Sequence, residues 1–209
     1  TTPQKAYDAL VNGGDVRPDP AQSHAIQRLQ TLSEALDAYG ARMGRSGWAA
    51  RLGLGGRKQP PPKGIYMWGG VGRGKSMLMD LFVETLGIAE KRRAHFHEFM
   101  LEVDRRMRER RTSDPGDPTG KVARDIAADV RCLAFDEMVV NNTADAAIMA
   151  RLFTALIRDE GVTVVTTSNR PPRDLYKDGL NRSLFLPFID LVEDEMDVLP
   201  LNGPTDYRL

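Results

Sequence analysis

Short apolar runs alternate with longer amphipathic stretches over most of the chain after residue 63. The apolar runs predict strands at Ile65–Trp68, Ala94–His97, Val130–Phe135, Val162–Thr167 and Asp197–Leu201. The stretches between them predict helices at Lys75–Leu86, Glu98–Arg110, Lys121–Ala128, Thr143–Asp159, Asp174–Asp178 and Ser183–Glu193. Strands that alternate with helices predict an α/β fold in three layers, with a five-stranded parallel sheet covered by helices on both faces.

The first 63 residues carry different patterns. Residues 1–46 predict a helical segment, because apolar residues from Ile26 to Leu36 recur at spacings of three and four and share one helix face. Residues 47–63 combine glycines, basic residues and three consecutive prolines, which is typical of a linker. The sequence therefore predicts an N-terminal helical segment, a linker, and a core domain over residues 64–209.

Composition narrows the class of protein further. Lys plus Arg and Asp plus Glu number 29 each, so the zero net charge gives no support to a nucleic-acid partner or a membrane surface. The single cysteine, Cys132, excludes an internal disulfide and favours a reducing compartment such as the cytoplasm. No apolar run reaches the roughly 20 residues that a membrane-spanning helix needs, and no signal-peptide pattern opens the chain.

The segment between the first predicted strand and helix of the core is rich in glycine. It reads GGVGRGKS and fits the pattern G-x-x-x-x-G-K-[ST] at every fixed position. Glycines let backbone N–H groups turn around phosphate oxygens without a Cβ clash, and the following helix adds its positive N-terminal dipole. A chance glycine turn is the alternative, but the flanking strand and helix favour a phosphate-binding loop. The residues predicted to contact the nucleotide are Gly69, Gly70, Val71, Gly72, Arg73, Gly74, Lys75, Ser76 and Met77.

Two later predicted strands end in polar residues. At the end of the strand RCLAF, Asp136 is placed to hold Mg²⁺ together with Ser76, partly through water, and Glu137 to activate the attacking water. The strand VTVVTT ends in Ser168 and Asn169, whose amide is suited to sensing the γ-phosphate. The alternatives are a solvated acidic turn at the first position and a turn cap at the second.

These motifs resemble a known division of phosphate-loop ATPases. An adjacent Asp-Glu pair followed by a polar sensor is similar to the pattern of AAA+ ATPases. The residues around the motifs resemble the ZapE family more closely. This family comprises bacterial cell-division-associated AAA+ ATPases with mitochondrial relatives. The resemblance covers nearly the whole chain and is carried by GIYMWGGVGRGKSMLMDLF, HFHEFM, FDEMVVNNTADAAIMARLF, TSNRPPRDLYKDGLNRSLFLPFI and TDYRL.

The resemblance implies roles for further residues. Lys75, Asp136, Glu137 and Asn169 match the catalytic positions of the family. Arg182 lies where AAA+ proteins carry an arginine finger that enters a neighbouring subunit. Arg173 is a rival for this role, and a surface ion pair is the alternative interpretation of Arg182.

A second segment is implied to lie near the base. Arg17 to Gln22, in RPDPAQ, resembles the segment that flanks the adenine. A helix N-cap at Asp19 is compatible with that role.

By resemblance, the chain is expected to bind ATP or ADP with Mg²⁺ and to hydrolyse ATP in the bacterial cytoplasm. It would assemble into a nucleotide-dependent homo-oligomer and remodel a protein partner of the FtsZ-based division machinery. A nucleotide-switched binding module and a helicase-loader-type ATPase acting on nucleic acid remain alternatives. The chain ends before the helical lid, with its second sensor arginine, that AAA+ subunits carry, so we expect a truncated product.

Three other features receive structural interpretations. His95 and His97 stand two residues apart and are expected on one face of a strand, without further ligands for a metal. Phe99 and Met100 are expected in the core. Cys132 lies inside a predicted strand and is expected to be an inert core residue.

Overall fold

A single parallel sheet organises the protein. The computed structural model describes residues 1–51, 60–113 and 115–202, without the side chains of residues 41–51. Its strands are β1 (Gly64–Trp68), β2 (Lys91–His95), β3 (Cys132–Asp136), β4 (Thr163–Ser168) and β5 (Met196–Pro200). They pair in the order β2-β3-β4-β1-β5, all parallel, which confirms the predicted sheet. Because all strands run the same way, the ends of β1, β3 and β4 meet at one edge.

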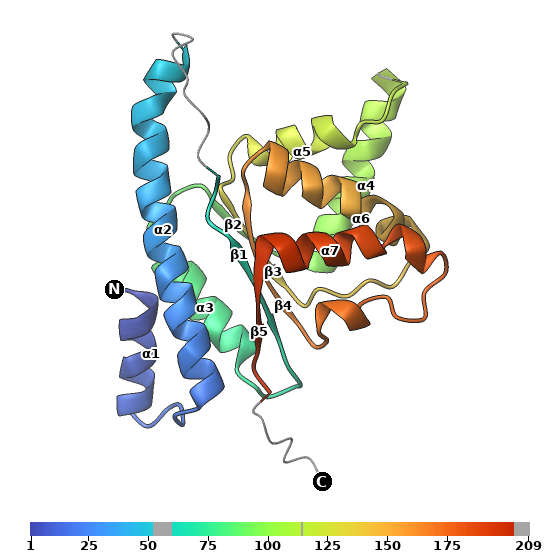
Figure 1. Cartoon of the computed structure of the whole chain (residues 1–209). Helices are drawn as coiled ribbons and strands as arrows, with labels where there is room; N and C mark the ends of the chain where they lie inside the picture. The colour runs from blue at the N-terminus through green and yellow to red at the C-terminus, as the bar shows by residue number, and fades with distance from the viewer. Residues whose placement is uncertain (52–59, 114, 203–209) are drawn as a thin grey trace.

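Helices cover both faces of this sheet (Figure 1). One face carries α1 (Pro3–Asn12), α2 (Pro20–Arg51) and α3 (Lys75–Thr85). The other carries α4 (Phe96–Ser113), α5 (Thr119–Ala127), α6 (Thr143–Thr154) and α7 (Leu186–Glu195). Two separate apolar clusters lie beneath the two helix layers, and alternate residues of the strands point into one or the other. The three-layer α/β fold is therefore confirmed.

The N-terminal helices share a core with the sheet. The apolar residues of α2 from Ile26 to Leu36 are buried in the same cluster as Ile65 and Met67 of β1. Helix α2 continues to Arg51, five residues into the range predicted as a linker from residue 47. Residues 52–59 of that predicted linker lie outside the described residues.

The region around β2 differs from the prediction. Strand β2 ends at His95, and α4 begins at Phe96, so His95 and His97 do not share a strand face. The physical reason is the spacing of Phe96, Phe99, Met100 and Val103, which are buried along one side of a helix. As an edge strand, β2 can carry the charged residues of KRR that a central strand could not.

Three predicted helices end or begin differently. The helix predicted over Thr143–Asp159 is α-helical to Thr154 and continues as a π-helical turn over Ala155–Asp159. The helix predicted at Asp174–Asp178 is only a 3₁₀ turn at Pro172–Asp174. The helix predicted at Ser183–Glu193 is a 3₁₀ turn at Arg182–Leu184 followed by α7, which begins at Leu186. Within the described part of the chain, none of the helices has the length and apolar character needed to cross a bilayer.

Candidate nucleotide site

The glycine-rich loop connects β1 to α3, as a phosphate loop does. Gly72 and Gly74 adopt left-handed backbone angles, with φ of 80° and 84°. A Cβ on Gly74 would also lie 2.6 Å from the side-chain nitrogen of Gln22. The backbone angle therefore favours glycine at position 74, and a Cβ there would also displace the Gln22 side chain. Val71 is 91% exposed on this loop.

Neighbouring segments brace the start of the loop. The N–H of Gly69 donates to the carbonyl of Ser168 at 3.1 Å, and the N–H of Gly70 donates to Oδ1 of Asn202 at 3.0 Å. The Lys75 ammonium donates to the carbonyls of Gly69 and Gly70 at 2.6 and 2.9 Å. Partial burial lowers the pKa of Lys75, while the charge of Glu137 acts in the opposite direction. The Lys75 ammonium thus lies across the start of the loop, where phosphate oxygens would be favourable partners.

Gln22 contacts the phosphate loop directly. Its Nε2 donates to the carbonyl of Arg73 at 2.9 Å, and its Oε1 accepts from the Tyr7 hydroxyl at 3.5 Å. Asp19 caps α2, since its Oδ1 accepts from the first-turn amides at 2.8 and 3.2 Å. The exposed Arg17 precedes this cap. The segment predicted near the adenine therefore contacts the phosphate loop through Gln22. It also caps α2 through Asp19.

The acidic pair sits at the end of β3 on an aromatic base. Phe135 is fully buried, and its ring packs against Phe99 and Phe153 with centroids 4.7 and 5.8 Å away. Glu137 follows in a left-handed conformation, with φ of 58°, that L-residues rarely adopt. Its N–H donates to Oγ1 of Thr167 on β4 at 3.0 Å. The fold therefore turns the chain sharply after Asp136 and leaves the Glu137 side chain exposed.

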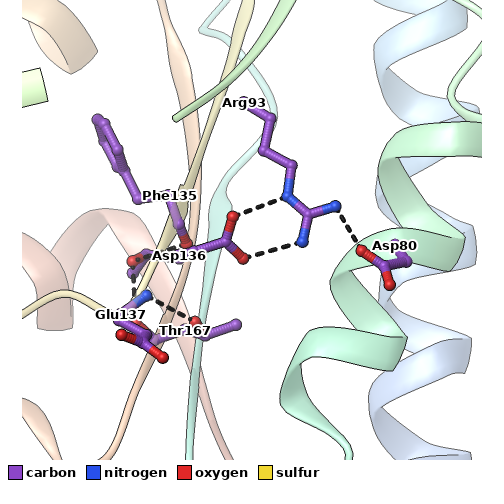
Figure 2. A network of polar contacts seen from close by, with 7 residues as sticks. Asp80, Arg93, Phe135, Asp136, Glu137 and Thr167 are labelled. Atoms are coloured by element: carbon purple, nitrogen blue, oxygen red, sulfur yellow. Dashed lines mark hydrogen bonds and ion pairs between the residues drawn. The ribbon is translucent and has the colours of Figure 1, made fainter. Parts of the chain in front are cut away.

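Asp136 forms a bidentate ion pair that the sequence did not reveal (Figure 2). Nε and Nη2 of Arg93, from β2, donate to its Oδ2 and Oδ1 at 2.8 and 3.0 Å. The remaining terminal nitrogen of Arg93 donates to Oδ1 of Asp80 on α3 at 2.5 Å. Hydrogen bonding to Asp136 raises the pKa of the guanidinium above its ordinary value, so Arg93 is a fixed positive charge.

A cavity of about 420 Å³ connects the loop to the acidic pair. Ser76, Asp136 and Glu137 all line it, together with Arg93. A hydroxyl and carboxylates are the hard oxygen donors that Mg²⁺ prefers, and Mg²⁺ is commonly held by only one or two carboxylates plus substrate phosphates. The donor set therefore fits a Mg²⁺ ion bound together with a nucleotide.

Asn169 lies next to this cavity but does not line it. It is exposed and lines a neighbouring cavity of about 510 Å³ between the segments that follow β3 and β4 and residues 175–179. Two hydrogen bonds fix the backbone beside it: Ser168 Oγ donates to the Met138 carbonyl at 3.1 Å, and the Tyr66 hydroxyl donates to the Arg170 carbonyl at 2.7 Å. The end of β4 is thus held beside the acidic pair, because β3 and β4 are paired.

Arg182 uses its guanidinium within its own chain. It donates to the carbonyls of Arg173, Leu175 and Tyr176 at 2.5, 3.3 and 3.1 Å. Its rival, Arg173, pairs with Glu193. Either residue would have to give up these partners to reach into a neighbouring subunit.

The loop after β1, the acidic pair after β3 and the helices on both faces define a phosphate-loop nucleotide-binding domain. The family model for AFG1-like ATPases matches residues 1–209, and the chain belongs to this family. It is 41% identical over 216 residues to the Cell division protein ZapE of Escherichia coli (strain K12), an alignment that covers 100% of the chain and 56% of that protein. The predicted family resemblance is therefore confirmed.

A eukaryotic relative and a solved structure are also similar to the chain. The Lactation elevated protein 1 homolog B of Danio rerio is 35% identical, over 97% of this chain and 49% of that protein. The chain thus spans about half the length of the curated relatives it matches. The crystal structure of DnaI superposes with a TM-score of 0.55 at 14% identity, covering 90% of this chain and 88% of that one. At that identity the likeness shows the shared fold alone.

Sequence reasoning missed Arg93, Asp80, Thr167 and Asn202. Arg93 lies in the charged run KRR, directly before the strand predicted at Ala94–His97, and it falls inside the observed strand Lys91–His95. Asn202 follows the last strand, and nothing local links it to the phosphate loop. These contacts depend on strand order.

Proposed function

We propose that the chain binds ATP with Mg²⁺ and hydrolyses it. The observation that carries this proposal is the cavity shared by Ser76 from the phosphate loop and by Asp136 and Glu137 from β3. Residues from separate parts of the sequence converge there with the chemistry that phosphoryl transfer needs. Membership of the AFG1-like ATPase family supports the same activity.

Each residue has a defined part in this proposal. The backbone of the phosphate loop and the Lys75 ammonium bind the phosphates, and Gln22 supports the loop through Arg73. Ser76 and Asp136 would hold Mg²⁺, which when bound offsets phosphate charge and orients the reacting group. Glu137 accepts the proton of the attacking water, for which its exposed side chain is accessible.

Two roles depend on residues beyond this cavity. Asn169, held at the neighbouring strand end, is proposed to sense the γ-phosphate. Arg182 is proposed as the arginine that a second copy of the chain contributes, once it leaves the carbonyls of its own loop. The role of Arg182 implies a homo-oligomer, and we propose that its assembly depends on nucleotide.

The purpose of hydrolysis is a further proposal. A relative named a cell division protein aligns with the whole chain at 41% identity, which supports a link to bacterial cell division. We propose a protein partner in the FtsZ-based division machinery of the cytoplasm. Hydrolysis would then drive remodelling of that partner. If nucleotide only switches partner binding, partner capture will depend on ATP while turnover stays unchanged by the partner.

Three proteins test the activity: the wild type, Lys75→Ala and Glu137→Gln. Binding of a fluorescent ATP analogue and phosphate release are measured for each. We expect Lys75→Ala to lose binding, because the loop loses the ammonium that lies against the Gly69 and Gly70 carbonyls. We expect Glu137→Gln to bind normally and to lose at least 100-fold in turnover, in the range typical of a positioned general base. Equal turnover in all three proteins refutes the assignment.

A further inference from the structure

The contact between Arg93 and Asp136 uses the carboxylate that the proposed function reserves for Mg²⁺. Two guanidinium nitrogens of Arg93 donate to the two oxygens of Asp136 in a fork (Figure 2). The Asp136 side chain is only 15% exposed, so solvent screens this pair weakly. A metal that bonds to Asp136, directly or through its waters, needs the same oxygens.

Arg93 has a second carboxylate at hand. Its third nitrogen donates to Asp80, which lies on α3 and is 51% exposed. Helix α3 begins at the phosphate loop, so Arg93 joins the strand of the acidic pair to the helix that receives the phosphates. A guanidinium with five N–H donors can release one carboxylate and keep the other without becoming an unpaired charge.

We propose that Arg93 is an exchangeable counter-cation for Asp136. In the arrangement seen, it neutralises Asp136; when Mg²⁺ enters with nucleotide, the guanidinium shifts its hydrogen bonds toward Asp80 and releases oxygens of Asp136 to the metal. Arg93 thereby sets how much Mg²⁺ the site requires, and Asp80 makes the exchange easier. This proposal rests on the proposed function, since it assumes that Asp136 holds Mg²⁺.

Two variants in the same network should act in opposite directions. In Arg93→Gln, Asp136 loses its competing cation, so we expect half-saturation at about three- to tenfold lower Mg²⁺. In Asp80→Asn, Arg93 has no second carboxylate and remains on Asp136, so the half-saturating Mg²⁺ concentration should rise by a similar factor. A purely structural role would shift both variants the same way.

The measurement is a Mg²⁺ titration of the binding of a fluorescent ATP analogue at fixed nucleotide concentration. Binding in EDTA shows that each variant retains a folded phosphate loop. Asp80 also attracts Mg²⁺ through space, and the double variant Arg93→Gln with Asp80→Asn separates this effect. If the exchange operates, Asp80→Asn will raise the Mg²⁺ requirement less in the Arg93→Gln background than in the wild type. Arg93→Lys replaces Arg93→Gln if that variant does not fold. Because a lysine ammonium lacks the bidentate fork and holds Asp136 less firmly, we expect a smaller shift in the same direction.

The outcomes separate the two proposals. If nucleotide binding by the wild type does not depend on Mg²⁺, the assumed metal role of Asp136 is wrong, and so is this inference. A Mg²⁺-dependent wild type with unshifted variants, or with both shifted alike, overturns the exchange alone and leaves the proposed function standing.

Discussion

The left-handed backbone at Glu137 predicts that the acidic pair is built at a cost in stability. The perturbation is a pair of substitutions, Glu137→Ala and Glu137→Gly. Both remove the same exposed carboxylate, whose side chain is not part of any described hydrogen bond. They differ in one atom, the Cβ, which is the source of steric strain at a φ of 58°.

The magnitude follows from two opposing effects. A Cβ in the left-handed region costs about 1–2 kcal/mol, which glycine avoids. Glycine also lowers the free energy of unfolding by about 0.4–1 kcal/mol relative to alanine, because the unfolded chain is more flexible with glycine. We therefore expect Glu137→Gly to be more stable than Glu137→Ala by about 1 kcal/mol. For a domain of this size, that corresponds to a difference of about 2–4 °C in Tm.

Urea unfolding of both variants, compared at equal slope, measures this difference. Arg108 supplies the control, since it is exposed in the middle of α4. There the order should reverse, with the glycine variant about 1 kcal/mol less stable than the alanine variant. Both Glu137 variants should lack hydrolysis equally. A glycine variant at position 137 that is no more stable than the alanine variant refutes the strain argument.

Three other predictions concern separate parts of the fold. Gly179→Ala should destabilise the protein by about 1–3 kcal/mol in thermal unfolding, because its Cβ would overlap the Tyr176 ring, whereas Gly120→Ala, with open space in a helix, should be neutral or stabilising by up to about 1 kcal/mol. Burial raises the pKa of the Cys132 thiol to about 12, so a thiol reagent at pH 8 should label it only after unfolding; rapid labelling of the native protein contradicts this. Gln22→Ala should weaken ATP and GTP binding alike, by about two- to tenfold, because it removes a hydrogen bond to the phosphate loop; a loss confined to ATP would indicate adenine recognition instead.

Much of the fold was predictable because its signals are local. Strand and helix periodicity marked all five strands to within a few residues, and the glycine pattern marked the phosphate loop. The errors fell where local signals compete. In KRRAHFHEFM, the charged residues gave no apolar strand pattern, so the start of the edge strand β2 was missed. Helix α4 also begins at Phe96, two residues before its predicted start at Glu98.

The sequence by itself indicated the class of site, since the glycine pattern before Lys75 and the polar strand ends at Asp136 and Asn169 are each read from a short segment. Only the tertiary structure decided which residues support them. Arg93 meets Asp136 across 43 residues, Gln22 meets the phosphate loop across 51, and Asn202 meets it across 132. These contacts exist because β2 pairs with β3, β1 lies between β4 and β5, and α2 packs on the same face as α3. Strand order and helix packing result from burial summed over the whole chain, and no local pattern encodes them.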